Sequence, residues 1–366
     1  MLPATSSHMF KYIHDTPVIL GASLQIKELT ISHLTDYNDP RLIQSKAWNM
    51  LLRLPTLFDL KLLVGEDHAK NGTSLSAGRS KFFIALPSQR LQPDVVQKLQ
   101  VLSLFYTDFW GWLPRMELDQ LGDLPSLKVL ALGRYVFTDK KQTDWIASLG
   151  QNNKSGGLEE LYIDECCIML EAKQRGPLPA GGYPVPGAGI HWNANIDRTK
   201  YGRQWHHVLS EWRVSMKGLK KFVMGVGDFG CPSRTMVPFC PRGPFSEATM
   251  VAGDLPEWYF GHNRHRFFTD PGPKDFVARL LDAYRSRRKS SMAVPMGNYL
   301  LGAGLTQSRR ARMRYAEYDF RLAYGWFIVN QSGGSDRAWV PEEGTVEFDD
   351  AAYALLMETI RDRLRS

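Results

Sequence analysis

The sequence lacks the features of a secreted or membrane-bound protein. Its 366 residues include only four cysteines, which show no paired spacing. Residues 1–20 hold no charged segment followed by an apolar run, and no window reaches the ~18 uninterrupted apolar residues that a membrane span requires. These absences predict an intracellular protein, cytoplasmic or nuclear, in a reducing compartment and without membrane association.

Motifs of common enzyme classes are absent as well. The chain contains no G-x-S-x-G, H-E-x-x-H, Walker or C-x-x-C pattern. Gly225, Gly227 and Gly230 match G-x-G-x-x-G, but prolines follow where a dinucleotide site needs the start of a helix. We therefore expect a non-catalytic protein without a cofactor. An enzyme with its site spread over loops 170–200 and 225–270 is the alternative.

A metal site is not expected either. Cys231, Cys240, His262 and His265 lie within 35 residues of one another. The cysteine spacing is wider, and the histidine spacing shorter, than in the usual zinc-binding patterns. The four residues are therefore interpreted as polar residues of a loop.

The net charge of +7 is unevenly distributed along the chain. Residues 264–321 hold thirteen Lys or Arg against five Asp or Glu. A phosphate or nucleic-acid binder that uses residues 285–314 is one hypothesis. No interleaved aromatic pattern accompanies these charges, so a solvated surface is the favoured interpretation.

What the sequence does contain is a recurring leucine pattern. Residues 158–168 read L-x-x-L-x-L-x-x-C-x-I, which is typical of the strand half of a leucine-rich repeat. Six other copies of the L-x-x-L-x-L core follow the same rule, and the last is degenerate: Ile26-Leu29-Ile31, Leu57-Leu60-Leu62, Leu99-Leu102-Leu104, Leu127-Leu130-Leu132, Leu219-Phe222-Met224 and Tyr315-Tyr318-Phe320. The pattern predicts one α/β domain over residues 1–366, a curved solenoid with a mostly parallel sheet inside and helices outside.

The segments between these copies complete the predicted organisation. Apolar spacing favours helices at 41–54, 144–149, 204–217 and 274–286, and a final helix within 349–366, capped by an aspartate, that would close the array. Residues 65–93, 170–200 and 225–273 are rich in Gly, Pro or polar residues and are predicted to be irregular loop insertions.

The residues that alternate with the core leucines should line the inner face of the sheet. They are Glu28, Thr30, Asp59, Lys61, Val101, Ser103, Phe105, Val129, Ala131, Glu160, Tyr162, Asp164, Lys221, Val223, Glu317 and Asp319. Phe105 and Tyr162 are candidate anchors for a protein partner, with charge selection by Lys61, Glu160 and Asp164. The alternative is that loops cover the two aromatic residues.

Four stretches resemble the repeat region of fungal F-box proteins. They are residues 205–212, 267–272, 315–321 and 349–365, and they lie within a region of degenerate leucine-rich repeats that extends from about Leu54 to the C-terminus. The resemblance implies the substrate-recognition part of a cullin-type ubiquitin ligase, with the ligase adaptor as a second partner. Of the F-box itself only Met1-Leu-Pro-Ala is present, so a repeat scaffold that acts without a ligase stays open as the alternative.

Overall fold

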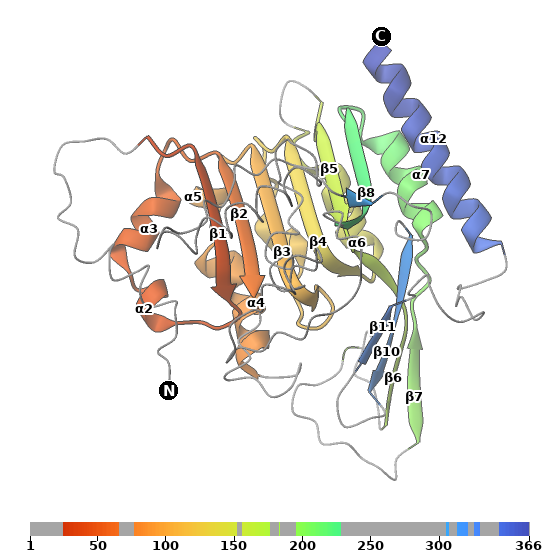
Figure 1. Ribbon diagram of the computed structural model, residues 1–366, viewed down its shortest axis with the longest axis horizontal. Coiled ribbons are helices and arrows are strands. Elements are labelled where there is room, and N and C mark those ends of the chain that lie inside the picture. The colour runs from red at the N-terminus through yellow and green to blue at the C-terminus, as the bar shows by residue number, and fades with distance from the viewer. Residues whose placement is uncertain are drawn as a thin grey trace, which may run out of the picture.

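The structure is a computed structural model that describes residues 25–65, 77–151, 156–175, 183, 195–227, 305–306, 313–320, 326–329 and 344–365. Six parallel strands form its main sheet (Figure 1). They follow the order β1 (Glu28–Thr35), β2 (Asp59–Gly65), β3 (Val101–Trp110), β4 (Val129–Phe137), β5 (Glu160–Asp164) and β8 (Lys221–Gly227). The sheet is open, which confirms the predicted α/β class with a mostly parallel sheet.

The six strands pair in matching register. Glu28 lies opposite Asp59, which lies opposite Val101, and the row continues through Val129, Glu160 and Lys221. Each L-x-x-L-x-L copy therefore occupies the same height in the sheet as its neighbours. The first six copies predicted from the sequence are all aligned in this way.

The same backbone turn precedes several of these strands. The N–H groups of Leu57, Leu99, Leu127 and Leu219 each donate to the carbonyl three residues earlier. Each of these leucines is at most 1% exposed. The first leucine of the pattern thus fixes the turn that leads the chain into the sheet.

Alternation along the strands separates two faces of the sheet. Leucines such as Leu60, Leu102 and Leu130 are buried in one continuous core with apolar residues of the helices. These helices are α2 (Pro40–Ile43), α3 (Lys46–Arg53), α4 (Ala77–Gln89), α5 (Pro93–Val96), α6 (Lys140–Ser148), α7 (Trp205–Ser215) and α12 (Thr345–Arg365), with a 3-10 turn at Leu118–Leu121. In Figure 1, α4, α5 and α6 lie behind the strands, so one face of the sheet is covered by helices.

Helix boundaries follow local capping. The predicted helix at 41–54 is divided in two because the Ser45 side chain accepts from the Trp48 N–H and starts α3. In α6, Asp139 and Gln142 form a reciprocal capping box, so the helix begins earlier than the predicted residue 144. The final helix begins at Thr345, and its expected aspartate cap is wrong because Asp349 and Asp350 lie inside its first turns.

A second branch of the sheet departs from the predicted repeat order. Strand β6 (Cys167–Arg175) pairs with the end of β4 and with β10 (Arg314–Phe320), and β7 (Ile196–Lys200) and β11 (Trp326–Val329) extend this branch. The prediction that Glu317 and Asp319 continue the inner row is therefore wrong, because β10 pairs with β6 instead of β8.

Two of the predicted loop insertions contain regular structure. Residues 65–93 include α4, whose Phe82 and Phe83 are buried in the core. Residues 170–200 include most of β6 and all of β7. Of 225–273, only 225–227 at the end of β8 are described, and the predicted helix at 274–286 lies outside the described residues. Among the described helices, none has the length and apolar content of a membrane span.

Candidate functional site

Apart from the exposed Thr30 on the edge strand β1, the accessible predicted residues of the inner face form its first lateral row. We call this row the lateral strip and define it as Glu28, Asp59, Val101, Val129, Glu160 and Lys221. Glu28 and Lys221 are exposed, and the other four residues are half-buried. The strands that carry these residues, from β1 to β8, lie side by side in Figure 1. The strip therefore has an apolar centre between charged ends.

The β1 and β2 end of the strip is organised by Lys61. Its Nζ donates to Asp59 Oδ2 at 2.8 Å and also to Glu28 Oε1. The Lys61 side chain is 3% exposed, whereas that of Glu28 is 54% exposed. Burial raises the pKa of Asp59, and the Lys61 ammonium opposes this shift. Lys61 therefore positions two carboxylates of the strip, and its own side chain is too buried to contact a binding partner.

The β5 and β8 end is organised by Tyr162. Its hydroxyl donates to Glu160 Oε2, and Lys221 Nζ lies 5.4 Å from the centroid of its ring. The ring is fully buried in a small cluster with Ala131 and Val223. Tyr162 thus positions both charged residues at this end of the strip.

The expectation of exposed aromatic anchors is corrected. Phe105 is 3% exposed and Tyr162 is 0% exposed. Phe105 packs directly over Gly133 on the neighbouring strand, because a Cβ at Gly133 would lie 2.1 Å from Phe105 Cδ2. Lys61 and Asp164 are also buried, at 2% and 1%. Of the five predicted partner-binding residues, only Glu160 lies in the lateral strip.

Asp164 and Phe105 lie toward the carboxyl ends of the strands, beside a charged cluster. Glu165 accepts from Arg134 Nε at 2.7 Å and from Arg314 Nη1 at 2.9 Å. Arg134 and Glu165 both adopt the left-handed backbone region, with φ of 57° and 55°. Arg314 belongs to the basic segment considered for phosphate binding, and its side chain is 9% exposed and bound to Glu165. The rest of that segment, apart from residues 305–306 and 313, lies outside the described residues.

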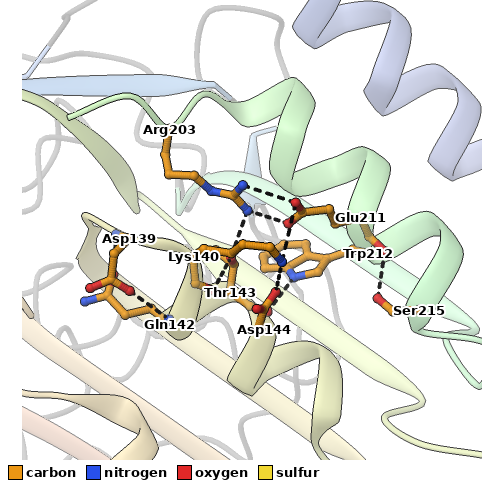
Figure 2. Close-up of polar contacts among 9 residues, drawn as sticks. All are labelled: Asp139, Lys140, Gln142, Thr143, Asp144, Arg203, Glu211, Trp212 and Ser215. Carbon is orange, nitrogen blue, oxygen red and sulfur yellow. Dashed lines mark hydrogen bonds and ion pairs between the residues drawn. The ribbon is translucent and has the colours of Figure 1, made fainter.

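A groove of 560 Å³ lies on the helical side, between α6 and α7. Figure 2 shows how the charged residues that line the groove are paired: Lys140 lies 2.5 Å from Asp144, and Glu211 accepts from Arg203, which does not line the groove. The Arg203 guanidinium lowers the pKa of Glu211. Each of the two acids that line the groove, Asp144 and Glu211, is thus already paired with a base. Its residues come from distant segments, and sequence reasoning did not identify it.

The start of α12 is joined to α7 by a buried carboxylate. Asp349 accepts from the His206 backbone N–H at 2.7 Å and from the Tyr315 hydroxyl at 2.6 Å. The His206 ring Nδ1 lies 3.1 Å from the same carboxylate. Burial raises the pKa of Asp349, while these donors lower it. This junction fixes the last helix on the sheet, and no sequence pattern predicted it.

Within the described ranges, no three His, Cys, Asp or Glu side chains gather as a metal site would require. The cysteines and histidines between 231 and 265 lie outside those ranges. Comparison with protein-family models, with curated proteins and with solved structures gives no match to this chain.

Proposed function

We propose that this chain is a non-catalytic protein-binding module built as a curved solenoid of irregular leucine-rich repeats. The observation that carries the proposal is the lateral strip, in which six strands hold six side chains in one row. Repetition of one strand turn at Leu57, Leu99, Leu127 and Leu219 supports the repeat interpretation. The absence of enzyme motifs from the sequence agrees with binding as the function.

The residues of the strip suit recognition of another protein. Val101 and Val129 offer a half-buried apolar centre, and the ends carry carboxylates and an ammonium group. Lys61 and Tyr162 hold the charged side chains, so little side-chain conformational entropy is lost when a partner binds. As part of the same proposal, the partner is the target of a ubiquitin ligase, as the resemblance to F-box repeat regions implies.

Affinity purification from the protein's own cells, followed by quantitative mass spectrometry, tests this proposal. The V101N/V129N double variant should lose the partner, because polar side chains at the centre would remain incompletely hydrogen-bonded on binding. V214N is the matched control, since Val214 is an exposed valine of α7 outside the strip.

A protein that the wild type and V214N retain, and that V101N/V129N loses, would support binding at the strip. Identical recovery by all three chains would refute the site. Recovery of a ligase adaptor and a cullin by the wild type would support the ligase role. Consistent absence of both beside a retained partner would favour the stand-alone scaffold.

A further inference from the structure

A buried arginine at the end of helix α4 has no opposite charge to balance it. Arg90 follows the last residue of α4 and is 1% exposed. Its Nε and Nη2 atoms are buried and have no hydrogen-bond partner among the described residues. Burial lowers the pKa of Arg90 to about 10, and no carboxylate within the described ranges raises it again. The chain therefore encloses this cation without an ion pair.

Another buried arginine, within α4 itself, shows how such a charge is balanced elsewhere in the fold. Arg79 is also 1% exposed, and its Nε donates to Asp36 Oδ2 at 2.8 Å. The Tyr106 hydroxyl donates to the same carboxylate oxygen at 2.7 Å. Burying an ion costs free energy, which a partner of opposite charge offsets when the geometry is good. Asp36 is that partner for Arg79, whereas the described residues provide none for Arg90.

The remaining contacts of Arg90 fix the direction of its guanidinium group. Nη1 donates to Asn38 Oδ1 at 3.0 Å, and Asn38 Nδ2 donates to the Lys81 carbonyl at 3.1 Å. The centroid of the Phe82 ring lies 4.6 Å from Arg90 Cζ, so this ring packs against the guanidinium as a cation–π contact. The edge without a protein partner carries Nε–H and one Nη2–H, which point in nearly the same direction. Such an edge is the fork that binds two oxygens of one anion.

We propose that this edge of Arg90 binds a small oxyanion, a carboxylate or a phosphate group, in bidentate geometry inside the fold. Two parallel N–H groups match the oxygen pair of either anion, and the negative charge balances the guanidinium. A water molecule would accept the same hydrogen bonds but would leave the charge unbalanced. The site uses no residue of the lateral strip or of the segment 285–314, so it is independent of the proposed binding role.

Because Arg90 is enclosed, the folded chain should hold the anion and the unfolded chain should not, so the anion should stabilise the fold. Above the dissociation constant, each tenfold rise in free anion should lower the unfolding equilibrium constant about tenfold. Urea unfolding of the intact chain, followed by circular dichroism over about 0.1–10 mM sodium phosphate, measures this dependence. A second series uses sodium acetate, and sodium chloride keeps the ionic strength constant in both.

Three variants separate the fork from other effects of the salts. R90M removes the charge and the fork, so its unfolding should not respond to either anion. R90K keeps the charge but loses the fork, and it should bind the anion about tenfold more weakly or less well still. R361M is the matched control, because Arg361 is an exposed arginine of α12, and it should respond as the wild type does.

The two series also identify the ligand class. A response of the wild type to phosphate alone would support a phosphate site, and a response to acetate would support a carboxylate site. Equal responses of the wild type, R90M and R361M would be a general salt effect and would overturn the proposal. So would a wild type that responds to neither anion. If R90M does not fold, equal anion affinity of the wild type and R90K would overturn it.

Discussion

Replacing Gly133 by alanine should destabilise the fold through a single contact on the inner face of the sheet. The added Cβ would lie 2.1 Å from Phe105 Cδ2 and 3.0 Å from its Cγ and Cε2. Phe105 is 3% exposed, and the Arg134 guanidinium lies 5.8 Å from its ring centroid, so the ring has little room to move. Overpacking of this kind costs ~1–3 kcal/mol of unfolding free energy.

A double-mutant cycle shows whether Phe105 is the cause. F105A alone removes a buried ring and should cost ~3–5 kcal/mol. In that background the Gly133 substitution should be nearly neutral, so the two effects should fall short of additivity by ~1–3 kcal/mol. Urea unfolding followed by circular dichroism gives the four free energies.

Gly202 provides the matched control for this cycle. A Cβ at Gly202 meets no atom within 4 Å, and the residue is exposed, so G202A should be close to neutral. Additive effects of G133A and F105A would refute the packing described for Phe105.

Three further predictions follow from buried polar groups. K61M should lower the unfolding free energy by about 2 kcal/mol or more, because Glu28 and Asp59 lose their shared ammonium. K140M is the control in urea unfolding, since Lys140 is exposed. Equal effects of the two substitutions would contradict the role of Lys61. W212F removes the 3.0 Å hydrogen bond from Trp212 Nε1 to Thr143 O that joins α7 to α6, and should lower the unfolding free energy by ~1–3 kcal/mol in the same assay. An unchanged midpoint of urea unfolding would show that the bond contributes nothing. The wild type should lose stability relative to D349N as pH rises from 4 to 7. Burial raises the pKa of Asp349 above its ordinary 3.8, so the stability from its protonated form is present below 3.8 and is lost as pH rises through the folded-state pKa. If the unfolding free energy of the wild type minus that of D349N increased with pH, this sign would be wrong.

The register of the main sheet could be read from the sequence because its cause is local. Leu57, Leu99 and Leu127 each mark the same turn before a strand, and the next two core residues set the alternation. The helix at 204–217 could be predicted in the same way, since Trp205, Leu209 and Trp212 are spaced to lie on one face, and all three are buried. The lateral order of Glu28, Asp59, Val101 and their neighbours followed from the same spacing.

Only the tertiary structure decided which of these inward residues are accessible. Phe105 is buried and its ring packs over Gly133 on the adjacent strand, a contact that the sequence does not indicate. Likewise β10 joins β6 instead of β8, which removes Glu317 from the row. Periodicity determines the face on which a side chain lies, whereas its exposure depends on what packs there from distant parts of the chain.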